Sequence, residues 1–298
     1  MAHPAVADAD SGLTGAQLAA RHGLKIAGAR PSLAAYTRLL WVYRHFTMAY
    51  ANAKLVSSFG QARLGRLWQV LTPLTNAAVY YLVFGVILST RQGVPNFIAY
   101  LCVGLFVFNF TQSVVNGGTQ AISGNVNMIR GLHFPRACLP VAVTITQLQN
   151  FVSAMVVLVA IVLITGEPIT WEWLLVLPAM LVQTVFNAGL AMIVARLGAK
   201  ATDLKQLMPF IMRTWMYGSG VLYSVDKFAQ NLPDTLTAVV HANPLLIYIE
   251  LFRHALLEGT VLTNPAPQLW LMGIGWALLV GVGGFIYFWR GEQEYGRG

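Results

Sequence analysis

The sequence predicts an all-α polytopic membrane protein with six transmembrane helices, and three observations lead to that fold class. First, 56% of the 298 residues are hydrophobic and only 10% are charged, which lies outside the range of soluble globular domains. Second, Arg213 is the only charged residue within the long apolar segments. Third, each segment is close to the roughly 20 residues that a helix needs to cross a bilayer. The six segments are 71–90, 97–118, 139–164, 173–195, 207–225 and 268–289.

The region before the first segment divides into a mobile cytoplasmic tail, residues 1–31, and an amphipathic region, residues 32–70. In the second part, aromatic and leucine residues recur three or four positions apart, with Arg38 and Arg44 between them. This spacing predicts a helix with one apolar face, typical of a helix that lies in the cytoplasmic membrane interface. A helix packed against other protein is the alternative interpretation.

The distribution of basic residues predicts the orientation. Fifteen of the 19 Lys and Arg residues precede the first segment, follow the last, or lie between segments two and three or four and five. Because Lys and Arg accumulate in cytoplasmic loops, both termini are expected in the cytoplasm and the protein in the plasma membrane. Residues 71–290 then form one transmembrane domain, and residues 291–298 form a cytoplasmic tail. The net charge of +8 is explained without a nucleic-acid partner.

A short helix is expected between segments two and three, where the sequence reads GGTQAISGNVNMIRGLHFPRACLP. Asn125 or Asn127 can cap its start, and Pro135 is predicted to end it. From these residues alone, a docking helix on the cytoplasmic side and a solvated turn are equally good interpretations.

The fifth apolar segment contains Arg213, which has two possible roles. Its long side chain can reach the cytoplasmic headgroups, or it can contact an anionic phosphate within a transport pathway. The sequence around Arg213 does not choose between them.

Residues 226–267 are not predicted to be a simple loop. Asn243 and Pro244 predict a helix start, with Asn at the cap and Pro at the first helical position. The helix that follows contains Glu250 and Arg253, which are spaced so that they can pair, and is too short and too charged to span. It is predicted to be re-entrant or to lie at the outer interface, forming a hairpin with the residues before it.

Aromatic residues gather near the outer halves of segments one, two and five. A channel lined by such side chains would suit a glycan, because sugar rings stack on aromatic faces, whereas Tyr and Trp also form ordinary interfacial belts. The candidate channel residues are Tyr80, Tyr81, Phe84, Tyr100, Trp215, Tyr217 and Tyr223.

Several function classes are excluded by motifs that the sequence lacks. It has no Gly-x-x-x-x-Gly-Lys-Ser/Thr motif for ATP and no His-Glu-x-x-His motif or close His pair for a metal. None of the six apolar segments contains Asp, Glu or His, which ion-driven transporters use to bind the coupling ion. The function classes that remain are a channel, a structural subunit and a permease driven by a separate ATPase. No catalytic residue is expected.

The order of these elements resembles the permeases of ABC-2 type transporters, in particular the branch that exports O-antigen, teichoic acid and actinobacterial galactan. Four motifs between about residues 35 and 290 carry the resemblance. They are FGQARLGRLWQVLTPL at 59–74, MIRGLHFPRACLP at 128–140, ARLGAKATDLKQLMPFIMRTWMYGSGVLYS at 195–224 and NPLLIYIELFRHALLEG at 243–259. Ser58 and Gly220 depart from the family pattern, which has a basic residue and a proline there.

The resemblance implies a homodimer that works with two copies of a separate P-loop ATPase subunit, which binds ATP and Mg; this chain would hold no cofactor. Residues 124–136 would form a coupling helix that docks on the ATPase. The docking residues implied in this way are Asn127, Met128, Arg130, His133, Phe134 and Arg136.

The substrate implied by the resemblance is a polyprenyl-diphosphate-linked polysaccharide that moves outward. Its diphosphate would lie near Arg63, Arg66 and Arg213, and membrane lipids would surround the dimer. A composition rich in Ala, Val and Thr but poor in Lys is typical of an actinobacterium and favours galactan lipid. The alternatives are a drug or small-lipid exporter of the same superfamily, and a passive channel or scaffold subunit without an ATPase.

Overall fold

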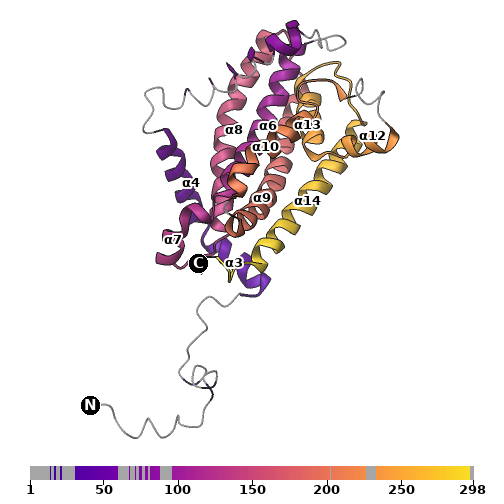
Figure 1. Cartoon of the computed structure of the whole chain (residues 1–298). Coiled ribbons are helices and arrows are strands. Elements are labelled where there is room, and N and C mark those ends of the chain that lie inside the picture. The colour runs from indigo at the N-terminus through magenta and orange to yellow at the C-terminus, as the bar shows by residue number, and fades with distance from the viewer. Residues whose placement is uncertain are drawn as a thin grey trace, which may run out of the picture.

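The computed structural model describes residues 31–59, 81–87, 96–201, 203–225 and 233–295, together with isolated positions between 14 and 79. These residues form helices and connecting segments without any strand, which confirms the all-α fold class. Figure 1 shows the long helices packed side by side in one bundle. The α-helices are α3 Leu33–Val42, α4 Arg44–Phe59, α6 Phe97–Thr119, α7 Val126–Gly131, α8 Cys138–Ile164, α9 Val176–Lys200, α10 Leu204–Tyr217, α12 Asp234–His241, α13 Pro244–Leu256 and α14 Ala266–Arg290. The remaining short helices are η1 Tyr81–Ile87, η2 Ser123–Asn125 and η3 Trp171–Leu175.

Four helices in the described part of the chain are long and apolar enough to cross a membrane: α6, α8, α9 with its preceding turn η3, and α14. They match predicted segments two, three, four and six. The pair α12 and α13, bent by 59°, counts as a fifth candidate if it is one broken span. Predicted segment one is described only at scattered positions and over 81–87, so the number of six spans stays a prediction.

The fifth predicted segment differs from a continuous span. Helix α10 has 14 residues and ends at Tyr217, which is shorter than a bilayer crossing. The chain leaves the helix at a Gly-Ser-Gly sequence, and Gly220 has a φ of +61°, a conformation that glycine adopts without strain. The break in the fifth segment is therefore produced by glycine.

Helix α6 is the centre of the bundle. Helices α8, α9, α10 and α13 all pack against it, and almost every side chain from Phe97 to Thr119 is buried or half-buried. The outer helices instead expose large apolar side chains, such as Leu181 on α9 and Leu279 on α14, at 66% and 65%. Such apolar surface would be unfavourable in water but is suited to contact with lipid.

The N-terminal helices pack on the bundle while also exposing apolar side chains. Helix α3 begins at Ser32, whose hydroxyl accepts a hydrogen bond from the amide of Ala35, and α4 packs against α8. Trp41 and Val56 remain 69% and 63% exposed. Helices α3 and α4 therefore both pack against the bundle and expose an apolar surface. Their position in the membrane interface stays a prediction.

Helix α13 is more buried than its charged residues led us to expect. Its side chains from Leu245 to Leu256 are almost all inside the protein, including Glu250 and Arg253 at 4% and 1% exposure. The helix packs against α6, α9, η3 and α14. It lies with α12 at the end of the bundle opposite α7 (Figure 1).

Candidate functional site

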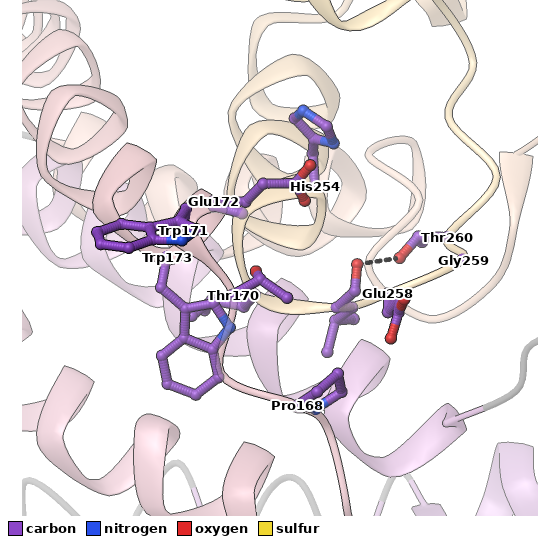
Figure 2. Close-up of a pocket in the computed structure, with 12 residues that line it drawn as sticks. Pro168, Thr170, Trp171, Glu172, Trp173, His254, Glu258, Gly259 and Thr260 are labelled. Atoms are coloured by element: carbon purple, nitrogen blue, oxygen red, sulfur yellow. Dashed lines mark hydrogen bonds between the residues drawn. The ribbon is translucent and has the colours of Figure 1, made fainter.

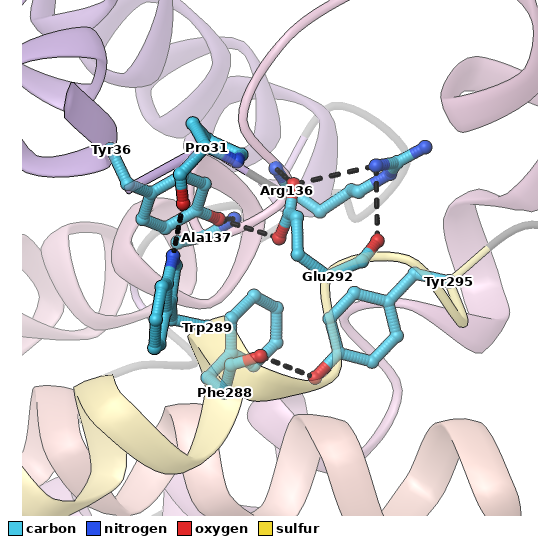
Figure 3. A network of polar contacts seen from close by, with 8 residues as sticks. All are labelled: Pro31, Tyr36, Arg136, Ala137, Phe288, Trp289, Glu292 and Tyr295. Carbon is cyan, nitrogen blue, oxygen red and sulfur yellow. Dashed lines mark hydrogen bonds and ion pairs between the residues drawn. The ribbon is translucent and has the colours of Figure 1, made fainter. Parts of the chain in front are cut away.

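Helix α3, the segment between α7 and α8 and the turn after α14 meet at one corner of the bundle. We call the residues Tyr36, Arg136, Ala137, Glu292 and Tyr295 the terminal corner (Figure 3). They come from α3, from the start of α8 and from the turn after α14, which are far apart in sequence. The corner is therefore a junction of three separate parts of the chain.

Glu292 is the central acceptor of the terminal corner and is only 4% exposed. One carboxylate oxygen, Oε2, accepts a hydrogen bond of 2.6 Å from the Tyr36 hydroxyl, and Oε1 accepts one of 3.0 Å from the amide of Arg136. The Arg136 guanidinium lies 3.4 Å from Oε1 and donates to the Glu292 carbonyl at 3.1 Å. A buried carboxylate with this many partners is satisfied, and loss of the Arg136 side chain would leave it without its counter-charge.

The protonation of the terminal corner is set mainly by burial. Burial raises the pKa of Glu292, while the hydrogen bonds from Tyr36 and the contacts with Arg136 act in the opposite direction. Burial and the Glu292 charge raise the pKa of Tyr36, so its hydroxyl stays protonated. The same hydroxyl accepts a hydrogen bond of 3.2 Å from the amide of Ala137, which connects α3 to α8.

The residues around the corner fix the end of α14. Trp289 donates from its indole nitrogen to the carbonyl of Pro31 at 3.0 Å. The Tyr295 hydroxyl donates to the carbonyl of Phe288 at 3.0 Å, and the two rings stack with centroids 4.6 Å apart. These contacts hold residues 291–295 as a defined turn on the bundle.

The predicted helix between α6 and α8 is present as α7, with two differences from expectation. Asn125 occupies the cap position, but its side chain accepts a 2.6 Å hydrogen bond from Tyr50 and donates to the carbonyl of Ala121, so it does not cap α7. The helix ends at Gly131 rather than Pro135, because Leu132 is already extended. The Asn residue thus attaches α7 to α4.

The six candidate docking residues fall into two groups. Asn127, Arg130 and His133 are exposed, whereas Met128, Phe134 and Arg136 are half-buried. Phe134 packs against Phe46 of α4 with ring centroids 4.9 Å apart, and Arg136 pairs with Glu292. The first group is free to contact a partner, and the second anchors the helix to the bundle.

At the opposite end, Arg253 connects α13 to two neighbouring segments. Its Nε and Nη2 donate to the Tyr100 carbonyl, both at 3.3 Å, and Nη2 donates to the Val221 carbonyl at 3.1 Å. The guanidinium carbon lies 3.3 Å from the centroid of the Tyr100 ring. Glu250, one turn earlier, accepts hydrogen bonds from the amide and the hydroxyl of Thr263. The two charged residues of α13 therefore hold different segments.

Asn243 confirms the predicted start of α13 and also reaches the end of α10. Its Oδ1 accepts from the amide of Leu245 at 3.1 Å, as a capping residue does, and from the indole of Trp215 at 3.0 Å. Its Nδ2 donates to the carbonyl of Gly218 at 2.8 Å. One side chain thus joins the start of α13 to the break after α10.

The candidate channel aromatics are only partly brought together. Tyr100 is buried and donates to the Tyr223 carbonyl at 3.3 Å, and the Tyr223 hydroxyl donates to the Tyr217 carbonyl at 2.6 Å. Trp215 is half-buried, Tyr217 is 48% exposed, and Tyr81 lies beside Phe97. Arg213 is exposed on α10. The side chains of Arg63, Arg66, Tyr80 and Phe84 lie outside the described residues.

Sequence reasoning missed Glu292 and the role of Tyr36. Tyr36 was recognised only as part of an apolar repeat, and Glu292 lies in a tail without a motif. The two residues are 256 positions apart, so no local pattern connects them. A carboxylate just beyond a terminal apolar span, in a chain with few acidic residues, is the only signal that was available.

Comparison with known proteins places the chain among transporter permeases. Residues 47–257 match the ABC-2 type transporter family. The O-antigen export system permease protein RfbA of Myxococcus xanthus is 30% identical over 81% of this chain and 91% of that protein. A protein of the same description from Klebsiella pneumoniae is 25% identical over 75% of this chain and 84% of its own length. The polysialic acid transport protein KpsM of Escherichia coli is 24% identical over 68% and 78%.

The family match covers most of the described helices, including α7 with its exposed residues, the break after α10 and the buried α13. The relative from Myxococcus xanthus extends the similarity over nearly its whole length. On this basis, the chain belongs to the ABC-2 type transporter family.

Proposed function

We propose that this chain is the membrane subunit of an ATP-driven exporter that moves a lipid-linked polysaccharide out of the cell. Two copies form the channel, and two copies of a separate P-loop ATPase bind ATP and Mg²⁺. The relatives support this proposal, since they are described as proteins of O-antigen export and polysialic acid transport. The Lys-poor composition favours actinobacterial galactan lipid as the substrate.

The geometry of α7 is the observation that carries the proposal. A helix that transmits motion from an ATPase needs an exposed surface to contact the ATPase. It also needs a rigid attachment to the transmembrane helices that move. Asn127, Arg130 and His133 are the free surface, and Arg136, held by Glu292, is the attachment. Motion of the ATPase would pass through the terminal corner to α8, α3 and α14.

The proposal also includes the orientation and the path of the anionic carrier. Both termini lie in the cytoplasm, the six apolar segments span the membrane, and α12 and α13 form the re-entrant outer hairpin. Arg213 is exposed in the middle of α10, a position from which a cation can contact a diphosphate. Arg63 and Arg66 complete this basic path.

Purification of the tagged chain from native membranes in mild detergent tests the proposal directly. The expected result is a P-loop ATPase at one-to-one stoichiometry together with the chain. Absence of any ATPase, under conditions in which other membrane complexes stay intact, would contradict the proposal and favour a passive channel or scaffold.

The substitution Arg130→Glu tests the docking surface within the complex. We expect at least a tenfold loss of transport-coupled ATPase activity, because the cation is exposed and would face an acidic partner surface. Lys205→Glu makes the same charge change on an exposed residue outside α7 and is expected to retain activity. Equal effects of the two substitutions would contradict docking through α7.

A further inference from the structure

A cavity of about 490 Å³ lies at the end of the bundle that carries α13, between the segment before α9 and the segment after α13 (Figure 2). Its volume is within the roughly 300–1,000 Å³ of small-molecule sites. One wall consists of residues 168–173 and the other of residues 254–260. Figure 2 shows the two walls facing each other. The cavity takes no part in the contacts of the terminal corner or of Arg253.

The walls of this cavity are held together by hydrogen bonds within the protein. The Glu167 carboxylate accepts from the amide of Glu258 and from the side chain of Asn96, both at 2.9 Å, so it joins the two walls to the start of α6. The Thr260 hydroxyl donates to the carbonyl of Leu257 at 3.2 Å. Gly259, with a φ of +67°, turns the chain back at this point. A cavity held in this way is preorganised for binding.

The chemistry of the lining selects a class of ligand. Trp171 and Trp173 offer flat apolar faces, and Trp171 is 88% exposed. Glu172 and Glu258 offer carboxylate acceptors, and His254 and the threonines offer further hydrogen-bonding groups. Aromatic faces beside groups that hydrogen-bond to hydroxyls match a sugar ring, which has an apolar C–H face and a polar edge.

The same lining disfavours other ligands. The twelve described residues around the cavity include two Glu but neither Lys nor Arg, so phosphates and acidic sugars would be repelled. Among the described residues, no group of three His, Cys, Asp or Glu side chains is close enough to hold a metal ion. A neutral sugar is the ligand class that meets both conditions.

We propose that this cavity is a binding site for a neutral sugar unit of a glycan. In the orientation that the proposed function assigns, on which this inference rests, the cavity opens on the outer face, where the exported polymer emerges. It would hold the leading sugars after they leave the channel and so oppose backward sliding. An interfacial tryptophan belt would also place Trp171 here, but it would bind no sugar.

Saturation-transfer NMR on the full chain in lipid nanodiscs, free of glycoside detergents, tests this proposal. The probes are the methyl glycosides of galactose, glucose and mannose, with methyl glucuronide as the anionic comparison. We expect saturation transfer from the protein to at least one neutral glycoside. The transfer to methyl glucuronide should be at least tenfold weaker. Trp171→Ala should abolish the signal, and Glu172→Gln should weaken it severalfold. Because both side chains are exposed, neither substitution should impair folding.

Trp41→Ala is the matched control, since Trp41 is equally free of core packing at 69% exposure but lies at the opposite end of the bundle. It should leave the signal unchanged. A wild-type protein that binds no neutral glycoside overturns the proposal, as does a signal that survives Trp171→Ala. Co-purification of the ATPase is measured separately from the NMR signal. A missing NMR signal with the ATPase present contradicts only the sugar site, whereas a missing ATPase contradicts the exporter assignment.

Discussion

Two buried charged residues, Glu292 and Arg253, organise opposite ends of the bundle. Glu292 joins α3, the start of α8 and the end of α14, and Arg253 joins α13 to α6 and to the segment after α10. Each is held by protein hydrogen bonds in place of water, so each substitution would leave several groups without their partners. These residues are therefore expected to control the geometry of their ends.

The substitution Glu292→Gln should lower the free energy of unfolding by roughly 1–3 kcal/mol, because the amide nitrogen faces donors and the Arg136 charge loses its partner. Thermal unfolding followed with a thiol-reactive dye measures this, since Cys102 and Cys138 are both buried and become reactive on unfolding. Glu294→Gln alters the ion pairs of an exposed carboxylate with Lys200 and Arg196, and it should leave the melting temperature nearly unchanged. Equal shifts in the two variants would contradict the central role of Glu292.

Stability should also depend on pH through Glu292. Burial raises its pKa in the folded protein above the unfolded value, so the folded state binds its proton more tightly. The part of the stability that depends on protonation of Glu292 is therefore fully present below the unfolded pKa and is lost as the pH rises through the raised folded pKa, while the hydrogen-bonded geometry contributes at every pH. The melting temperature of the wild type minus that of Glu292→Gln should therefore decrease as the pH rises through this range. A difference that grows with rising pH would contradict the predicted sign.

Arg253→Lys should destabilise the protein by roughly 1–3 kcal/mol despite retaining the charge, because a single ammonium cannot bond both carbonyls and stack on Tyr100. Arg290→Lys, on an exposed residue, is the matched control and should have little effect. The thiol-dye assay applies again. A fully stable Arg253→Lys protein would show that the planar guanidinium is not needed.

At the scale of helices, close approach of α9 and α14 depends on glycine. A Cβ added at Gly189 would overlap the carbonyl of Val280, and one at Gly284 would overlap the carbonyl of Gly189. Small residues allow helix backbones to approach in this way within membranes, where packing replaces the hydrophobic effect. This pair has the most extensive contact of any two helices in the described structure.

Gly189→Ala should therefore separate α9 from α14 and reduce stability by roughly 1–3 kcal/mol. Gly283→Ala is the matched control on α14, because a Cβ there meets nothing within 4 Å. The control should be neutral or slightly stabilising, since alanine favours helix over glycine. Comparison of the two melting temperatures decides the matter, and a Gly189→Ala protein as stable as the control would contradict the packing argument.

The sequence was sufficient to predict elements whose signals are local. The length of the apolar runs predicted α6, α8, α9 and α14, and the Asn243-Pro244 pair predicted the start of α13 to the residue. It was not sufficient where distant residues decide the outcome. The pairing of Arg136 with Glu292 and the deep burial of Glu250 and Arg253 on α13 were not predicted. Both outcomes depend on which helices pack together, which a single sequence does not encode locally.

At the scale of the whole molecule, α7 and the sugar-site cavity lie at opposite ends of the bundle (Figure 1). The proposed orientation predicts that Glu258→Cys is labelled by a membrane-impermeant maleimide on intact cells, and Asn127→Cys only after permeabilisation. Both positions are exposed and both native cysteines are buried, so background labelling is low. Labelling of Asn127→Cys on intact cells, with Glu258→Cys labelled only after permeabilisation, would overturn the orientation. It would also overturn the proposed direction of transport.

The contact between Tyr36 and Glu292 has a consequence for biogenesis. Glu292 follows Tyr36 by 256 positions, so the terminal corner cannot close until α14 has been synthesised and inserted. Until then, α3 and the residues before α8 lack their shared contact with Glu292. A chain that stops before Glu292 would contain all the long described helices yet leave the Tyr36 hydroxyl and the Arg136 amide without their acceptor.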